Sequence, residues 1–147
     1  MFNNIYKDKT VFVTGHTGFK GSWLTLWLNF LGAKVIGYSN GVPTIPSNFT
    51  TSNIKEKITD IEGDILELDN LTAVLKNENP DFIFHLAAQS LVKESYLSPV
   101  DTWKTNTIGT LNILDAVRQS KISTNIILIT SDKCYDNVEW LWGYRET

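Results

Sequence analysis

The sequence predicts an α/β protein built around a doubly wound parallel sheet. Apolar segments of strand length alternate along the chain with segments of helix length, and a glycine-rich turn joins the first strand to the first helix. The last strand segment, NIILIT, carries apolar residues on both faces, which is typical of a parallel sheet covered on both sides. Strands that alternate with helices also imply right-handed crossovers between parallel strands.

The segments follow in the order strand, helix, strand, loop, strand, helix, strand, helix, strand. Val11–Val13 forms the first strand, and the apolar segment Phe19–Leu31 has the spacing of a helix that Gly32 ends. A loop rich in Pro, Ser, Thr and Asn follows the second strand. The later elements are expected to be strand Lys34–Tyr38, loop Ser39–Asn53, strand Ile58–Ile61, helix Asn70–Lys76 with Asp69 as its N-cap, strand Asp81–Leu86, helix Val100–Gln119 beginning near Pro99, and strand Asn125–Thr130.

Composition narrows the class of protein. The 147 residues are 42% hydrophobic, which is enough to bury a core and excludes a disordered tail. The formal net charge of −3 does not suggest a nucleic-acid or membrane-surface binder. One cysteine excludes an intrachain disulfide and a Cys-rich metal site, so we expect no metal. With no apolar run of the roughly 18 residues that span a membrane, the chain is expected to be soluble and cytoplasmic.

The turn after the first strand reads TGHTGFKG, with Gly15, Gly18 and Gly21 in the pattern G-x-x-G-x-x-G. In such a turn the first glycine permits the bend, the second lets a pyrophosphate approach the backbone, and the third lets the helix pack near the strand. The helix N-terminus then offers N–H groups to phosphates. We therefore expect a nucleotide site, with a purely structural turn as the alternative. A P-loop is excluded, because Lys20 precedes Gly21 instead of following a glycine.

The end of the second strand lacks one residue that dinucleotide sites usually have. An Asp or Glu there normally binds the hydroxyls of the adenosine ribose, and an Arg accommodates a 2′-phosphate. This chain reads Tyr38-Ser39-Asn40 at that point, with neither a carboxylate nor an Arg. The position does not decide between NAD and NADP, and either Ser39 or Asn40 could bind the ribose instead.

Five motifs occur in the order seen in extended short-chain dehydrogenases/reductases: TGHTGFKG (14–21), GD (63–64), HLAAQ (85–89), NTIGT (106–110) and TSDKCY (130–135). The chain resembles this superfamily over nearly its whole length, and within it the sugar-nucleotide 4,6-dehydratases that act on CDP-glucose. The segment TSDKCYDNVEWLWGYRE (130–146) is the most specific, because related sugar dehydratases usually have a carboxylate where Lys133 stands. The superfamily's Tyr-x-x-x-Lys segment does not follow, so residues 1–147 are expected to form a truncated NAD-binding Rossmann domain without the substrate-binding part.

The resemblance implies a reaction in which NAD takes a hydride from C4 of the sugar, water is lost across C5 and C6, and the hydride returns to C6. Ser131 would then hydrogen-bond the 4-hydroxyl, Asp132 would protonate the departing 6-hydroxyl, and Lys133 would take the C5 proton as a neutral amine. A solvated turn is the alternative for Asp132 and Lys133. The implied partners are CDP-glucose and a second copy of the chain, in deoxysugar biosynthesis of the kind that supplies lipopolysaccharide O-antigen.

The resemblance also assigns contacts to NAD. Residues of the glycine turn would line the pyrophosphate, residues after the third strand would meet the adenine, small residues ending the fourth strand would admit the cofactor, and two residues of the long helix would lie near the nicotinamide. In that order these are Gly15, Thr17, Gly18, Phe19, Lys20 and Gly21; Asp64 and Ile65; Leu86, Ala87, Ala88 and Gln89; and Thr105 and Asn106. For Asn106 a buried core position is nearly as good an interpretation.

Other residues and functions stay open. His85 lies in an apolar strand and is expected to be a hydrogen-bonded core histidine, whereas a phosphate contact by His16 is open. Trp23 and Trp27 recur on one side of the first helix, as in core or interface packing. The alternative functions are an NAD(P)-dependent nucleotide-sugar epimerase or reductase, which would lack the acid and base of Asp132 and Lys133, and a non-catalytic NAD-binding module.

Overall fold

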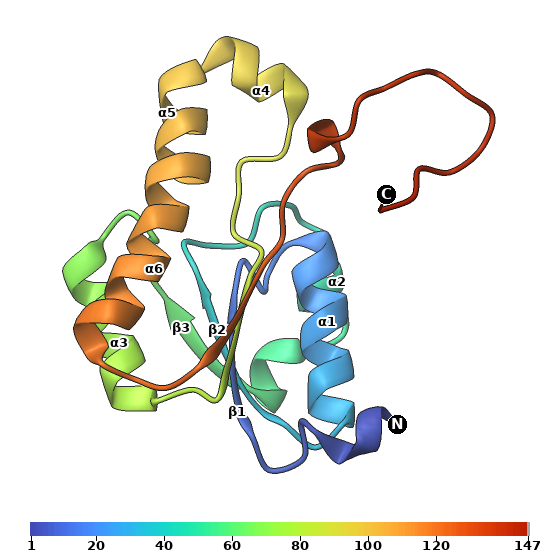
Figure 1. Cartoon of the computed structure of the whole chain (residues 1–147). Coiled ribbons are helices and arrows are strands. Elements are labelled where there is room, and N and C mark those ends of the chain that lie inside the picture. The colour runs from blue at the N-terminus through green and yellow to red at the C-terminus, as the bar shows by residue number, and fades with distance from the viewer. Residues whose placement is uncertain (147) are drawn as a thin grey trace.

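A five-stranded parallel sheet forms the centre of the computed structural model, which describes residues 1–146 apart from the side chain of Lys133 (Figure 1). The strands lie in the order β3-β2-β1-β4-β5. From β1 the chain runs outward to β3 and then crosses to β4 and β5, so the sheet is doubly wound, as the sequence predicts. Their bounds are β1 (Thr10–Thr14), β2 (Lys34–Ser39), β3 (Thr59–Glu62), β4 (Phe82–His85) and β5 (Asn125–Leu128).

Helices cover both faces of this sheet (Figure 1). On one face lie α1 (Phe19–Phe30) and the short α2 (Asn48–Thr51), and on the other α3 (Leu68–Glu78) packs along α6 (Gly109–Ser120). Before α6 the chain forms α4 (Val92–Leu97), then α5 (Pro99–Trp103), which continues into α6 through a π-helical turn, η3 (Lys104–Ile108). Short 3-10 turns occupy Phe2–Asn4, Ile54–Lys57 and Asp132–Cys134.

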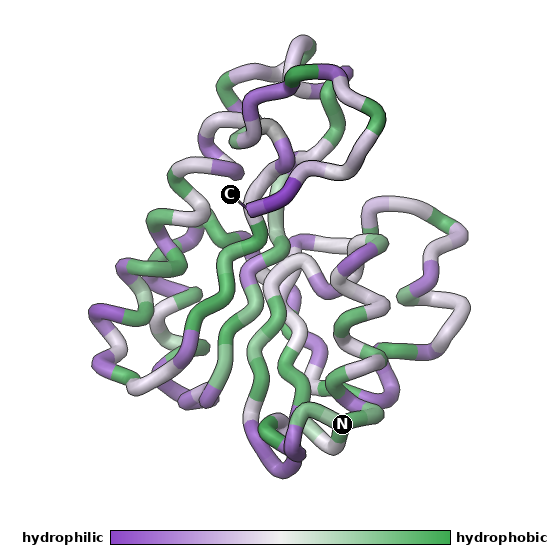
Figure 2. Tube along the Cα trace, turned by 45° about the vertical axis from the view of Figure 1, so that its right-hand side comes forward, coloured by the Kyte–Doolittle hydropathy of each residue, from purple (hydrophilic) through white to green (hydrophobic). Residues whose placement is uncertain are grey.

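The strands supply two cores because successive side chains of a strand point to opposite faces. On β1, Phe12 is fully buried in the core under α3 and α6, together with Leu71 and Ile113. Val11 and Val13 are fully buried on the other side, against Leu28 of α1. Figure 2 shows the strands as a hydrophobic band between more hydrophilic helices and loops.

Several boundaries differ from the expected ones. Helix α3 begins at Leu68, which packs on the core, so Asp69 lies inside the helix and Glu67 takes the N-cap position. The helix expected over Val100–Gln119 is present, but the π-helical turn η3 interrupts its α-helical pattern. The sequence did not indicate α2 or α4, and β5 ends two residues before Thr130.

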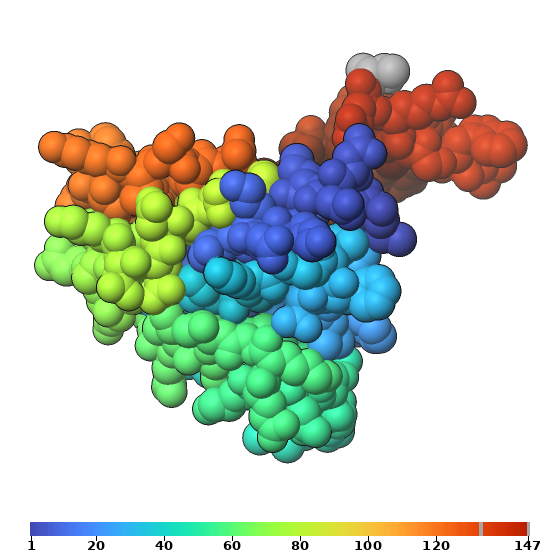
Figure 3. All heavy atoms as spheres, turned by 90° about the horizontal axis from the view of Figure 1, so that it is seen from below, coloured from blue at the N-terminus to red at the C-terminus, as the bar shows by residue number. Residues whose placement is uncertain are grey.

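After the 3-10 turn at Asp132–Cys134, residues 135–146 form no helix or strand and extend beyond the body of the molecule (Figures 1 and 3). The ring of Tyr144 packs against those of Tyr135 and Trp140, and all three are exposed. Within residues 1–146, no helix is both long enough and apolar enough to cross a membrane.

Candidate nucleotide-binding site

The candidate site lies where the carboxyl ends of the central strands meet. Since β1, β4 and β5 are parallel and in register, with Thr14 opposite His85 and His85 opposite Leu128, their last residues share one edge of the sheet. The N–H of Ile129 donates to the His85 carbonyl at 3.1 Å and extends this ladder past the end of β5. The segments that follow the three strands are the glycine turn, residues 86–89 and residues 131–133. Ligands of open α/β sheets bind at this edge.

The glycine turn has the geometry of a close backbone approach. Gly15 has a φ of +69°, and its N–H donates to the Tyr38 carbonyl at 2.9 Å. A Cβ on Gly15 would lie 2.8 Å from the Ala87 backbone, and a Cβ on Gly21 would overlap the Gly15 carbonyl. Helix α1 then begins at Phe19 without a capping side chain, so the N–H groups of its first turn are available to an anion.

Thr17 ties this turn to the end of β2. Its hydroxyl donates to the Gly41 carbonyl at 2.7 Å and lies 3.1 Å from Ser39 Oγ. The Thr17 side chain is buried, whereas Phe19 and Lys20 are exposed at the start of α1. Thr17 therefore fixes the position of the turn, and its neighbours Phe19 and Lys20 face solvent.

His16 points away from the phosphate side of the turn. Its ring is fully buried over Gly37, where any Cβ would overlap it, and it meets the ring of Phe49 edge-on. Its Nε2 lies 2.7 Å from Asp60 Oδ1. Burial lowers the pKa of His16 despite the opposing effect of the Asp60 carboxylate. The buried His16 ring is therefore not exposed to a phosphate, and it instead joins the glycine turn to β3.

His85 is a buried core histidine, as expected, with both ring nitrogens hydrogen-bonded. Thr14 Oγ1 accepts from the N–H groups of Leu86 and Ala87, so its own proton is directed at His85 Nδ1, 2.7 Å away. Nε2 then carries the ring proton and donates to Thr110 Oγ1 at 3.0 Å. Because burial lowers the pKa of His85 to about 4, the ring is neutral at pH 7.

The chain of hydrogen bonds continues into the π-helical turn. Thr110 Oγ1 donates to the Asn106 carbonyl at 2.8 Å. The Asn106 side chain holds Gln89 at two points, since Oδ1 accepts from its N–H at 2.8 Å and Nδ2 donates to its carbonyl at 2.9 Å. Asn106 is exposed, so the buried core position is wrong for it, while Thr105 beside it is half-buried. Asn106 thus fixes the segment after β4 against the long helix.

The residues assigned to the adenine differ in role. Asp64 is half-buried, and its Oδ1 accepts from the N–H of Leu66 at 2.8 Å. Ile65 is buried in the core under α3 and α6, where its side chain fills the space that a Cβ on Gly109 would need. Leu86, Ala87 and Ala88 continue from β4 beneath the glycine turn and are half-buried or exposed.

The residues assigned to catalysis follow β5 at the same edge. Ser131 Oγ donates to Asp132 Oδ1 at 3.2 Å, and both residues are exposed. The Cys134 thiol donates to the Ser131 carbonyl at 3.0 Å. The side chain of Lys133 lies outside the described part of the chain. Among the described residues, no group of three His, Cys, Asp or Glu side chains is arranged to hold a metal ion.

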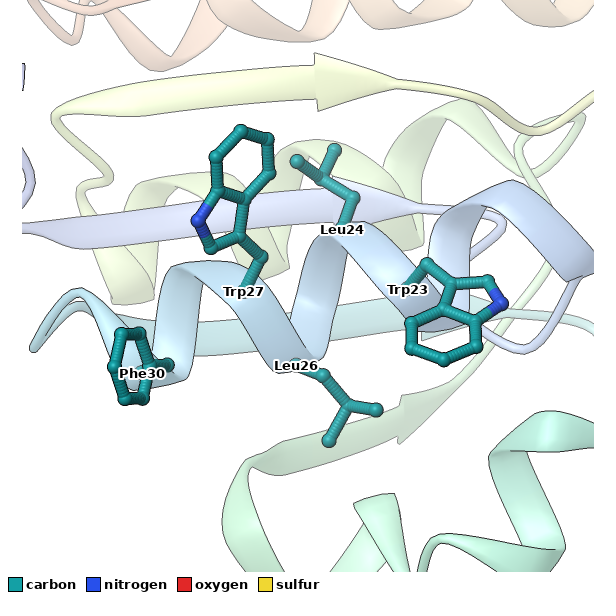
Figure 4. A pocket seen from close by; sticks show the side chains of 5 residues that line it. All are labelled: Trp23, Leu24, Leu26, Trp27 and Phe30. Carbon is teal, nitrogen blue, oxygen red and sulfur yellow. The ribbon is translucent and has the colours of Figure 1, made fainter.

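The exposed side of α1 carries an apolar surface that is separate from this edge. A cavity of about 570 Å³ is lined by Trp23, Leu24, Leu26, Trp27 and Phe30 (Figure 4). Trp27 also meets the ring of Phe2 edge-on. These apolar side chains offer a phosphate no donor besides the indole N–H groups. The glycine turn is therefore the better nucleotide site, because the N–H groups in the first turn of α1, which follows it, have no capping side chain.

Comparison with known proteins agrees with this architecture. The model of the GDP-mannose 4,6-dehydratase family matches residues 12–145. The chain belongs to this family. It is 48% identical over 143 residues to CDP-glucose 4,6-dehydratase of Salmonella typhimurium, covering 97% of this chain and 40% of the relative. It is 31% identical to CDP-paratose 2-epimerase of Salmonella typhi, over 92% of the chain and again 40% of the relative. The chain thus spans about 40% of the length of these relatives.

Solved structures have the same fold over a similar share of their length. The UDP-glucose 4-epimerase of Brucella ovis, determined in complex with NAD, superposes with a TM-score of 0.76 at 28% identity, covering 90% of this chain and 39% of the epimerase. The epimerase Mth375 of Methanothermobacter thermautotrophicus superposes with a TM-score of 0.77 at 27% identity, covering 97% and 41%. The chain therefore has a Rossmann-like fold that matches the N-terminal part of these epimerases.

The sequence did not identify three residues that organise the carboxyl edge of the sheet: Thr14, Asp60 and Thr110. Each contributes a hydrogen bond to a histidine from a distant part of the sequence. A polar residue at the end of the apolar strand VFVT was the one available signal, and it marked Thr14.

Proposed function

We propose that the chain is the cofactor-binding portion of a sugar-nucleotide 4,6-dehydratase that converts CDP-glucose to CDP-4-keto-6-deoxyglucose with bound NAD. The similarity to the Salmonella typhimurium CDP-glucose 4,6-dehydratase carries this proposal, since it extends over 97% of the chain at 48% identity. Ser131, Asp132 and Lys133 support it, because they follow β5 at the edge where the glycine turn lies.

The glycine turn fits a dinucleotide. Gly15 and Gly21 leave room that any Cβ would fill, and the uncapped start of α1 offers N–H groups to a pyrophosphate. When bound, NAD would supply the hydride acceptor and donor of the internal redox cycle. Gly15, Gly18 and the first turn of α1 would hold its phosphates.

The chain's own residues would orient the sugar and move its protons. Ser131 would hydrogen-bond the sugar 4-hydroxyl, Lys133 would take the C5 proton, and Asp132 would donate a proton to the departing 6-hydroxyl. Proton donation by a carboxylic acid near neutral pH requires a dry environment, and Asp132 is exposed in this chain. We therefore expect the remaining length of the enzyme, on the pattern of the relatives, to cover Asp132, and the 147 residues alone to be inactive.

An epimerase is the second candidate, favoured by the similarity to CDP-paratose 2-epimerase. An epimerase needs no acid for a leaving 6-hydroxyl and no base for C5. The sequence Ser131-Asp132-Lys133 therefore favours the dehydratase. A module that binds NAD without catalysis is the third candidate.

Pairing of two copies is proposed from the exposed apolar side chains of α5 and α6, which include Val100, Trp103, Leu111 and Leu114. A cytoplasmic location is likewise proposed, because nucleotide sugars are cytoplasmic substrates in the reaction that the resemblance implies.

The proposal is tested by incubating CDP-glucose and NAD with two proteins and following the sugar by NMR. One is the chain alone, and the other is a chimera in which residues 1–147 replace the matching part of the Salmonella typhimurium relative. We expect a 4-keto-6-deoxy sugar from the chimera and none from the chain. A chimera that binds NAD but returns unchanged sugar, or a C2 or C4 epimer, would refute the dehydratase.

A further inference from the structure

Helix α1 is apolar on its outer side as well as on the side that packs on the sheet. Residues 21–33, GSWLTLWLNFLGA, contain no charged residue, whereas a helix at a protein surface normally carries charged residues on its outer side. Trp23, Trp27 and Phe30 follow the spacing of one helix face, and Figure 4 shows their side chains on the outside of the helix. A helix that is apolar all round is typical of one that is covered on both sides.

The exposed rings are large enough for a protein interface. Trp23 is 57% exposed, Trp27 46% and Phe30 81%. Phe2, which meets the Trp27 ring edge-on, is 51% exposed. At about 200 Å² for a fully exposed aromatic side chain, these four residues leave roughly 450 Å² of apolar area open to water. A standard interface buries about 800 Å² per partner, of which about 56–65% is apolar. The apolar surface of α1 therefore supplies the apolar share of one such interface.

The charge pattern favours a second copy of the chain as the occupant. The partner of this surface has to be apolar, because residues 21–33 offer no charge to a charged partner. A second copy presents the same apolar surface, and Lys20 is the one charged residue of α1. In an antiparallel pair the two Lys20 residues lie about 20 Å apart along the helix axes, beyond the screening length of about 8 Å at physiological salt. A parallel pair would place them side by side.

We propose that α1 is a pairing surface, on which a second copy of the chain packs its own α1 in the antiparallel direction. The two-fold axis passes between Leu26 and Trp27. Trp23 of one copy then meets Phe30 of the other, and the symmetry repeats this contact. The cavity of about 570 Å³ among these side chains receives rings of the second copy. Antiparallel packing also sets the positive end of each helix dipole beside the negative end of the other.

This pairing is separate from the nucleotide site and from pairing through α5 and α6. It concerns neither NAD nor the sugar, so it does not rest on the proposed function. Helices α1 and α6 lie on opposite faces of the sheet (Figure 1). Two-fold interfaces on both faces would join four copies of the chain.

The test is sedimentation of the chain at about 100 µM, well above a micromolar Kd. All samples carry Trp103→Glu, which removes pairing through α5 and α6. Trp23→Glu is then added to place a charge in the α1 contact, and Trp23→Phe is added in a separate sample to keep an aromatic ring there. Trp142→Glu is the matched control, because Trp142 is also an exposed tryptophan but lies in the segment after β5.

The chain with Trp103→Glu alone should sediment as two copies, and so should the samples with Trp23→Phe or Trp142→Glu added. Trp23→Glu should weaken pairing about thirtyfold or more and give one copy, because an aromatic side chain is lost from the interface. A second readout needs no variant in α1. In a mixture of ¹³C-labelled and unlabelled chains, nuclear Overhauser contacts should join Trp23 of one copy to Phe30 of another.

A single copy in the sample with Trp103→Glu alone, or unchanged pairing after Trp23→Glu, would overturn the inference. Loss of pairing in Trp142→Glu would also overturn it, since the occupant would then be residues 135–146. In the chimera, contacts of Trp23 with residues of the relative instead of a second Phe30 would assign the surface to the rest of the enzyme and would likewise overturn the pairing.

Discussion

Protonation of His85 gives a quantitative prediction about stability in acid. The side chain is 3% exposed and lies between two threonine hydroxyls, with Nδ1 accepting from Thr14 and Nε2 donating to Thr110. Protonating Nδ1 would break the first of these bonds and place an uncompensated charge in the core. The perturbation is therefore a decrease in pH from 7 to about 4.5, within reach of ordinary denaturation experiments.

The expected magnitude follows from the difference in pKa between the folded and unfolded states. Burial lowers the pKa of folded His85 from 6.5 to about 4, so the unfolded chain takes up a proton that the folded chain refuses. Stability from this residue is complete above pH 6.5 and is lost as the pH falls toward 4, up to about 3 kcal/mol over the window. The pKa of His16 is also lowered, which acts in the same direction. The carboxylates Asp81 and Asp115 have lowered pKa values, so they lose their contribution only below about pH 4.

The assay is urea unfolding at several pH values for wild type and His85→Gln, which removes one of only two histidines. Between pH 6 and pH 4.5 the unfolding free energy of wild type should fall more steeply, by about 1.4 kcal/mol per pH unit relative to the variant. NMR titration of the wild-type imidazole provides a second measurement, which does not depend on the variant folding. Equal slopes, or a His85 pKa above 6 in the folded chain, would refute the assignment of a buried neutral ring.

Three further predictions concern the edge of the sheet. Gly15→Ala should weaken NAD binding about tenfold in calorimetry, because a Cβ strains the positive φ of residue 15 and meets the Ala87 backbone. Gly143→Ala is the control and should leave the affinity unchanged, because residue 143 has open space around it. Equal NAD affinities of the two variants would contradict a close approach of the cofactor to Gly15. Thr14→Val should destabilise the chain by about 2 kcal/mol in urea, since the Ala87 N–H and His85 Nδ1 lose their hydrogen-bond partner, and a change below about 0.5 kcal/mol would argue against that network. In the active chimera, Lys133→Ala should permit oxidation at C4 but block water loss, and retained exchange of the C5 hydrogen with solvent would count against Lys133 as the base.

The fold was predictable because its signals are local. VFVT, KVIGYS and FIFH are largely apolar segments of strand length. The turn glycines occur between the first strand and the first helix, where a dinucleotide-binding turn is expected. The start of α3 was misplaced because Asp69 is a good N-cap type, whereas packing of Leu68 on the core makes the helix begin two residues earlier. Burial in the tertiary structure outweighed the capping preference there.

The arrangement of the candidate site was less predictable, because its hydrogen bonds join residues far apart in sequence. His16 lies within the phosphate-binding motif, yet its ring packs over Gly37 and reaches Asp60, 44 residues away. Thr17 lies in the same motif, and its hydroxyl donates to the Gly41 carbonyl, 24 residues away. No pattern within one segment could have indicated these partners.

The central claim is that a dinucleotide binds at the carboxyl edge of the sheet, over the glycine turn. Its most direct test is an amide chemical-shift map of the ¹⁵N-labelled chain during titration with NAD. Saturable shifts should appear at Gly15, Gly18 and Ala87, and the indole signals of Trp23 and Trp27 should move less. Shifts confined to the apolar surface of α1, or a spectrum that NAD leaves unchanged, would contradict the claim.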